Sequence, residues 1–203
     1  MEKYNINANY KLIGKLFYVL IFLIYLISVV IIFSHGFENI FQLIRRITGL
    51  TGIISLFIAI LLSLLVKQSK QVFGISYLRI HHYFSISGII LVSIHPLVMA
   101  IDFGTFRIFI PDFSSWDSFL RNGGRTALYM IYIAAIAAIA RKNIVRNWKY
   151  LHGLIYPAFI FGAIHGILQG SDLQNPILYA LFIVFIVLVI FIFMYKRYLS
   201  IRK

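Results

Sequence analysis

Residues 145 to 170 read VRNWKYLHGLIYPAFIFGAIHGILQG, a mostly apolar stretch that carries His152 and His165 thirteen residues apart. An α-helix rises about 1.5 Å per residue, so the two histidines lie roughly 20 Å apart along the axis. The hydrocarbon core of a bilayer is about 30 Å thick, so a helix over this stretch crosses it with one histidine near each edge.

A second apolar stretch repeats the arrangement. Residues 78 to 100 read LRIHHYFSISGIILVSIHPLVMA, with His81 and His82 at the start and His95 fourteen or thirteen residues later. Two membrane-spanning helices that each carry histidines at two matched depths predict that two flat cofactors are held between them.

The composition is that of an integral membrane protein. Hydrophobic residues make up 61% of the 203 and charged residues 12%, whereas soluble domains contain about 25% charged residues. Mean hydropathy is +0.91. In a soluble protein, a net charge of +13 would suggest that the protein binds nucleic acid. In a membrane protein, the positions of the positive residues instead indicate on which side of the membrane each loop lies. We therefore expect no nucleic-acid partner. The absence of cysteine excludes disulfides, iron–sulfur clusters and thiolate ligation of haem.

Apolar windows predict an all-α bundle of six transmembrane helices in a single transmembrane domain over residues 1–203. The first apolar run is long and no small-residue cleavage site follows it, so we interpret it as a retained helix and not as a signal peptide. An even number of spans places both termini on one side of the lipid bilayer. The expected spans are 14–33, 47–66, 78–100, 126–140, 150–169 and 176–195.

The distribution of charge orients this bundle. With both termini in the cytoplasm, fourteen of the 19 lysines and arginines lie inside and five outside, and Glu2 is the only one of the six acids inside. Because positive charge collects in cytoplasmic loops, we expect a multi-pass protein of the plasma membrane with cytoplasmic termini. The inner group is Lys3, Lys11, Lys15, Lys67, Lys70, Arg79, Arg141, Lys142, Arg146, Lys149, Lys196, Arg197, Arg202 and Lys203; the outer group is Arg45, Arg46, Arg107, Arg121 and Arg125.

Four histidines fall into two pairs at similar depths, which favours ligation over the commoner role of a satisfied interior polar group. Neutral imidazole is an axial haem ligand, and bis-histidine ligation leaves no open position on the iron, which favours electron transfer. One zinc ion cannot use histidines about 20 Å apart on a helix. Proton relay remains open, although no carboxylate lies inside the predicted spans. His35 is in an outer loop and is given no role.

Helical phase separates the candidates. At 100° per residue, fourteen residues return to within about 40° of the starting direction, so His81 and His95 share a face, whereas thirteen residues miss by about 140°. His152 and His165 therefore splay on an ideal helix, and Pro157 between them is expected to kink or rewind it. His82 stays open as the inner ligand, a propionate partner or a side chain facing the headgroups, and we prefer His81.

Other residues near the predicted ligands allow two interpretations. Gly153, Gly162 and Gly166 either clear room for a porphyrin edge or serve helix packing. The aromatic outer loop, about 102–125, is interpreted as an interfacial belt in preference to a substrate platform. Arg45, Arg46 and Arg125 are predicted to contact the haem propionates, only because of the side of the membrane and the depth at which they are expected to lie.

These stretches resemble the ferric reductase-like transmembrane family, which includes membrane ferric reductases, the NADPH oxidase membrane domain and MsrQ-like haem subunits. The similarity runs over roughly residues 45–195 and leaves the extra N-terminal helix, about 14–33, outside. Its most specific part is Trp-x-x-Leu-His with a second histidine thirteen residues later. The matching stretches are RITGLTGI at 46–53, HHYFS at 81–85 with His95 and Pro96, and WKYLH at 148–152 with His165.

The resemblance implies a set of ligands. An inner haem b would bind His81 and His152, and an outer haem b would bind His95 and His165. The thirteen-residue spacing that an ideal helix does not explain is the spacing that the family shows in this helix.

The resemblance also implies a function and leaves the electron donor open. Reductases and oxidases of the family usually continue into a cytoplasmic domain for FAD and NADPH, but no Gly-rich dinucleotide motif occurs in the 203 residues. We therefore expect a cytochrome b, a membrane oxidoreductase component that takes electrons from a cytoplasmic flavoprotein reductase or a quinol. Flavin would enter only through that partner. The electrons would pass through two haems to an extracytoplasmic acceptor such as ferric iron.

Three alternatives remain at this point. One is an MsrQ-like haem subunit that feeds a periplasmic methionine sulfoxide reductase. Another is a b-type cytochrome that anchors a quinone enzyme. The third is a non-haem channel, transporter or scaffold in which the histidines are structural.

Overall fold

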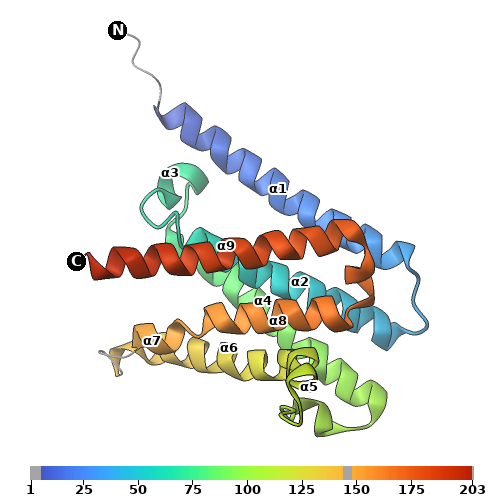
Figure 1. Ribbon diagram of the computed structural model, residues 1–203. Helices are drawn as coiled ribbons and strands as arrows, with labels where there is room; N and C mark the ends of the chain where they lie inside the picture. The colour runs from blue at the N-terminus through green and yellow to red at the C-terminus, as the bar shows by residue number, and fades with distance from the viewer. Residues whose placement is uncertain (1–5, 144–147, 203) are drawn as a thin grey trace.

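The computed structural model describes residues 6–143 and 148–202, and within these ranges the chain forms helices, turns and no strand (Figure 1). Six helices are long and apolar enough to cross a membrane. The chain is therefore an all-helical, multi-pass membrane protein, as the apolar windows predict. Four residues used in the charge count lie outside the described residues: Glu2, Lys3, Arg146 and Lys203.

Each predicted span has a helical counterpart, and shorter helices lie in the loops between them. The long helices are α1 (Ile6–Ser34), α2 (Ile40–Leu62), α4 (Tyr77–Phe103), α6 (Gly123–Ile139), α7 (Trp148–His152) followed by α8 (Ile155–Gln169), and α9 (Pro176–Ile201). The loops contain α3 (Ser69–Phe73), α5 (Trp116–Arg121) and the short 3₁₀ turns η1 (Phe106–Phe109), η2 (Ala140–Lys142) and η3 (Ser171–Gln174).

Helix α2 begins at Ile40, ahead of the predicted span 47–66. Asn39 caps it, because its side-chain oxygen accepts a hydrogen bond from the Gln42 N–H at 2.8 Å. The apolar window missed this start because two arginines lie in the second turn of the helix. The arginines are therefore held on a helix and not in a loop.

The outer loop is also shorter than predicted. Asp102 lies in the last turn of α4 and Arg125 in the first turn of α6, so both belong to helices and not to a loop over 102–125. Gly104 ends α4 with φ of 62°, a left-handed conformation that glycine adopts without strain. Both ends of the loop are thus fixed by helices of the bundle.

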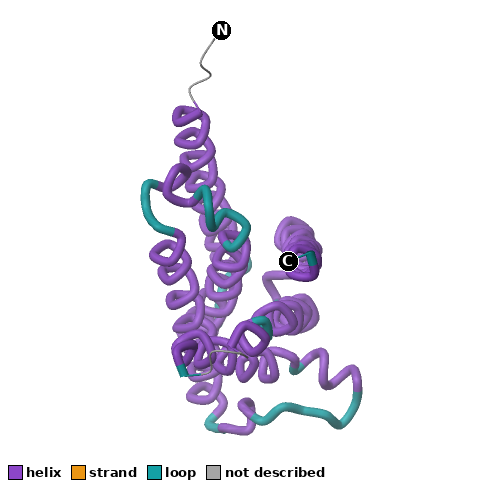
Figure 2. The backbone as a smooth tube through the Cα atoms, turned by 90° about the vertical axis from the view of Figure 1, so that its left-hand side faces the viewer, coloured by secondary structure: helices purple, strands orange, loops and turns teal. Residues whose placement is uncertain are grey.

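Two antiparallel hairpins carry the histidines. The first hairpin is α2 with α4, and the second hairpin is α6 with α7 and α8. In Figure 2 the bundle is seen from one end, with the C-terminus of α9 toward the viewer. Helix α1 rises away from the other helices toward the N-terminus. Four of the predicted site histidines are therefore distributed as two per hairpin, on α4 and on α7 with α8.

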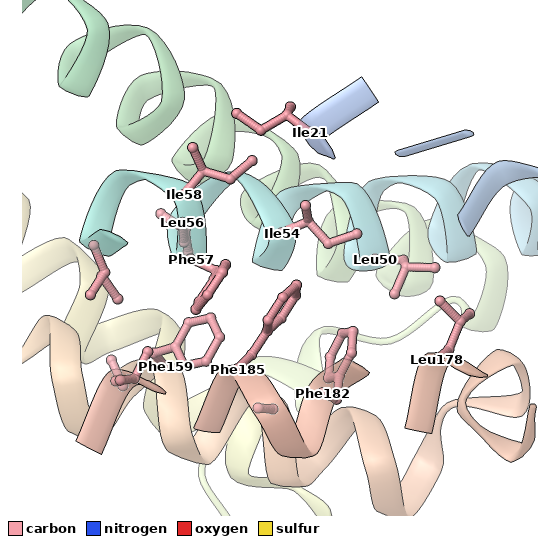
Figure 3. Close-up of a cluster of buried hydrophobic side chains, with 14 of the residues drawn as sticks. Ile21, Leu50, Ile54, Leu56, Phe57, Ile58, Phe159, Leu178, Phe182 and Phe185 are labelled. Atoms are coloured by element: carbon pink, nitrogen blue, oxygen red, sulfur yellow. The ribbon is translucent and has the colours of Figure 1, made fainter. Parts of the chain in front are cut away.

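Helix α2 lies at the centre of the buried core, against α8 and α9 (Figure 3). Phe57 of α2 stacks on Phe185 of α9 with ring centroids 3.8 Å apart, and it packs against Phe159 of α8 at 5.9 Å. These contacts join the two hairpins to α9. Helix α1 leaves most of its apolar side chains exposed, as expected for a helix that faces lipid.

A buried ion pair lies at the end of the bundle that carries η3, which we call the outer end after the orientation that the charges predict. Arg46 of α2 donates to Asp172 of η3 at 2.5 and 2.9 Å, and the two side chains are 9% and 8% exposed. The same guanidinium donates to the carbonyls of Ile32 at 3.0 Å and of Gly36. Because each donor or acceptor left unpaired in an apolar setting is costly, this network fixes α1, α2 and η3 relative to one another.

The orientation in the membrane can be tested on α3 and the loop before α5, which the helix order places at opposite ends of the bundle. The chain has no cysteine, so a single introduced cysteine reports on its own position. We expect Ser114→Cys to react with a membrane-impermeant maleimide in intact cells, and Lys70→Cys to react only after permeabilisation, because positive charge orients Lys70 toward the cytoplasm. The reverse pattern would overturn the charge-based orientation.

Candidate functional site

Each of the four predicted ligand histidines makes the same kind of hydrogen bond. Its ring Nδ1 lies next to a backbone carbonyl of a neighbouring helix: α2 for His81 and His95, α6 for His152, and the last residue of α5 for His165. A carbonyl oxygen only accepts, so Nδ1 carries the proton and a neutral ring keeps its lone pair on Nε2. The distances are 3.1 Å from His81 to Ala59, 2.9 Å from His95 to Arg45, 3.0 Å from His152 to Ala134 and 2.5 Å from His165 to Arg121.

The spacing of these carbonyls matches the spacing of the histidines. On the first hairpin, the two accepting carbonyls are fourteen residues apart, as are His81 and His95. On the second hairpin, the two carbonyls are thirteen residues apart, as are His152 and His165. On the first hairpin, α2 supplies both carbonyls; on the second, α6 supplies the carbonyl for His152 and the end of α5 supplies the one for His165.

The break between α7 and α8 explains how a thirteen-residue spacing serves this purpose. The Leu154 N–H donates to Leu151 and the Tyr156 N–H donates to Gly153, both at 3.1 Å, so the chain makes tight turns between residues three apart. In such turns, successive side chains are rotated by about 120° about the helix axis, and not by the 100° of an α-helix. Pro157 has no N–H with which to continue the α-helical ladder. The expected interruption is present, and both histidines of the segment face α6 and the end of α5.

His82 and His35 are placed differently. His82 is exposed on α4, next to Tyr83, and among the residues that the structure describes no backbone carbonyl holds its ring as Ala59 holds the His81 ring. The phase argument for His81 agrees with this geometry. His35 lies 3.4 Å from Asp172 and so belongs to the network around Arg46.

One cavity of about 340 Å³ lies between the two hairpins toward their outer ends. His95 lines it from α4 and His165 from α8, so the structure brings these two predicted ligands to a common space. The volume falls in the range of cofactor and small-molecule sites. Apolar residues from both hairpins make up much of the wall: Leu50, Ile53, Leu56, Val92, Leu128, Ile131, Ala158 and Phe159.

The inner pair has a different setting. Neither His81 nor His152 lines the cavity. Tyr77 stacks on the His81 ring with centroids 5.2 Å apart. In the described part of the chain, no group of three or more histidine, cysteine or acidic side chains converges as a metal ion would need.

Two glycines make room for the outer histidine rings. A Cβ on Gly49 would lie 2.7 Å from Nδ1 of His95, and a Cβ on Gly124 would lie 2.6 Å from Cδ2 of His165. Only glycine allows the rings to approach α2 and α6 this closely.

The three arginines that the sequence analysis predicts as propionate contacts all line the cavity. Two of them have carboxylate partners that the sequence did not reveal. Arg45 donates to Asp102 at 3.2 Å, and Arg46 is bound by Asp172. Arg125 donates to the carbonyl of Ile110 at 2.8 Å.

The sequence analysis also missed polar residues at the mouth of the cavity. Gln42, Asn122 and Gln169 line it, and Gln169 donates to the same Arg121 carbonyl as His165, at 3.3 Å. No local pattern singles these residues out. They come together only because the outer ends of α2, α6 and α8 meet.

Comparisons of the chain with protein-family models, with curated proteins and with solved structures find no match. The resemblance to the ferric reductase-like family therefore stays a prediction that rests on the quoted motifs.

The glycine contacts give a stability prediction. Gly49→Ala and Gly124→Ala each push a Cβ into a histidine ring, so we expect each to lower the free energy of unfolding by about 1–3 kcal/mol. Gly162→Ala is the matched control in the same cavity, because its Cβ would meet Ile53 only at 3.4 Å. Thermal unfolding of the detergent-purified variants checks this. Equal unfolding midpoints for all three variants would contradict the proposed ring positions.

Proposed function

We propose that this protein is a cytochrome b that carries single electrons across the plasma membrane through two bis-histidine haems. His81 and His152 would ligate the inner haem, and His95 and His165 the outer one. The observation that carries the proposal is the shared geometry of the four rings: each has its Nδ1–H held by a carbonyl and its Nε2 lone pair left for a metal.

The residues of the outer pair fit a haem. Two neutral imidazoles from facing hairpins, an apolar wall and close-approach glycines at both rings suit a flat, largely apolar cofactor. Haem, when bound there, supplies reversible one-electron chemistry at its iron.

The protein's own part is to orient the histidine rings and to tune the basicity of their Nε2 atoms. A carbonyl that accepts the Nδ1–H fixes the tautomer and the rotation of the ring and raises the basicity of Nε2. Two imidazoles leave no open position for oxygen or a substrate. The surrounding apolar side chains exclude water and lower the local dielectric. These features favour electron transfer over chemistry at the metal.

Of the three arginines, Arg125 fits a propionate contact best. Arg45 and Arg46 have carboxylate partners, whereas Arg125 lines the cavity and donates to a backbone carbonyl. A guanidinium with donors to spare suits a carboxylate at the mouth of an apolar site.

The orientation set by the charges assigns donor and acceptor sides. Electrons would enter at the cytoplasmic end, from a flavoprotein reductase or a quinol, and leave toward an extracytoplasmic acceptor such as ferric iron. The short basic helices and turns at the inner end, which include Lys70, Arg141 and Lys149, are where a cytoplasmic donor would dock.

One observation favours a second candidate, an MsrQ-like subunit that serves an extracytoplasmic reductase. The cavity joins His95 and His165 but does not reach His81 or His152. An arrangement with haem at the outer pair alone would match that difference.

Substitution of single histidines tests the proposal. We expect the pyridine haemochrome assay to give about two haems b per purified wild-type chain. His81→Ala, His95→Ala, His152→Ala and His165→Ala should each lose about one haem, because a single remaining imidazole holds the group weakly. His82→Ala is the matched control and should keep the wild-type ratio.

The outcomes separate the candidates. A wild-type ratio of about one, lost on His165→Ala and unaffected by His81→Ala, would favour the MsrQ-like arrangement. A wild-type protein without a Soret band after expression with haem supplied would overturn both and return the histidines to a structural or transport role.

A further inference from the structure

A hydrogen bond between side chains joins the two histidine hairpins. The Tyr132 hydroxyl of α6 lies 2.8 Å from Oγ of Ser93 on α4. Ser93 Oγ also lies 2.6 Å from the Ile89 carbonyl, to which it donates its single proton. Ser93 therefore accepts, and Tyr132 is the donor that crosses from the second hairpin to the first.

The position of this bond relates it to the outer histidine pair. Ser93 lies two residues before His95 on α4. The residues adjacent in sequence to the bonded pair, Val92 and Ile131, line the cavity that His95 and His165 share. The bond therefore joins α4 to α6 at positions next in sequence to residues that line the cavity.

Each ring is already held by a backbone carbonyl, that of Arg45 in α2 for His95 and that of Arg121 at the end of α5 for His165. Between the hairpins, the separation and relative rotation of the His95 and His165 rings depend on how α2 and α4 pack against α6 and α8. Apolar contacts such as Phe57 with Phe159 contribute to that packing, but they have little directional preference. A hydrogen bond between fixed positions is directional.

We propose that Ser93 and Tyr132 are positioning residues that set the register of the two hairpins and thereby the angle between the imidazole planes of His95 and His165. This inference rests on the proposed function, because it concerns the geometry of the outer haem ligands. Neither side chain ligates the metal; both act through the helices that carry the ligands.

The chain supplies a matched control. Tyr25 of α1 bonds to Ser55 of α2 at 2.6 Å, and Ser55 donates to the Thr51 carbonyl at 2.8 Å. This is the same Tyr–Ser–carbonyl arrangement, but it joins α1 to the first hairpin and leaves the second hairpin untouched. Tyr25→Phe therefore removes an equivalent bond without loosening the seam between the ligands.

The test uses full-length, haem-loaded protein as wild type, Tyr132→Phe, Ser93→Ala and Tyr25→Phe. The first readout is the low-spin electron paramagnetic resonance signal, which depends on the angle between the two axial imidazole planes. The second is the rate of haem transfer to an excess of apo-globin. We expect the signal of one haem to shift and its release to become about threefold faster in Tyr132→Phe and Ser93→Ala, the size typical of an interhelical hydrogen bond in a membrane protein. Tyr25→Phe should match the wild type.

Other outcomes overturn the inference in distinguishable ways. If Tyr132→Phe binds haem with the wild-type signal and release rate, the positioning role is wrong while the proposed function stands. If Tyr132→Phe and Tyr25→Phe change release equally and neither shifts the signal, the bond serves general stability only. If the wild type binds no haem, the proposed function fails and the inference fails with it.

Discussion

The hydrogen bond from histidine Nδ1 to a backbone carbonyl is the interaction on which the rest of the site depends. It occurs four times, and each time it satisfies the polar N–H of a side chain at membrane depth. Leaving a hydrogen-bond donor unpaired costs several kcal/mol in a fully apolar solvent. Inside proteins the measured cost is about 1–3 kcal/mol. The bond makes the ring stable in the bilayer and also leaves Nε2 as its free nitrogen.

The hairpin arrangement follows from this requirement. A helix satisfies its own backbone in the membrane but not its side chains, so a histidine needs a partner from a neighbouring helix. Helix α2 supplies both carbonyls for His81 and His95, and α6 and the end of α5 supply one each for His152 and His165. Glycine allows the approach at the outer end, where Gly49 and Gly124 lie under the His95 and His165 rings.

Much of this architecture could be predicted from local patterns. Apolar windows give the six spans, and a fourteen-residue phase argument favours His81 over His82 on α4. The position of the helix break was expected from Pro157, but its form, a turn at Gly153 and Leu154 that separates α7 from α8, was not. A tight turn changes the phase of a helix without leaving a clear trace in the hydrophobic pattern.

Long-range pairings could not be predicted at all. Arg46 and Asp172 are 126 residues apart in sequence, and nothing in either segment indicates that they form a buried ion pair. The same holds for the Tyr132 bond to Ser93, and for a cavity that reaches the outer histidine pair and not the inner one. These features depend on how the hairpins pack, which composition and periodicity do not encode.

The most direct test of the central claim is electron transfer across a closed bilayer. Purified, haem-loaded protein would be reconstituted into liposomes with dithionite trapped inside and ferricyanide outside, two reagents that cross lipid poorly as ions. We expect ferricyanide reduction well above that of protein-free liposomes, accompanied by reduction and reoxidation of the haem bands. Reduction no faster than in protein-free liposomes would contradict the claim that this bundle conducts electrons between the two faces of the membrane.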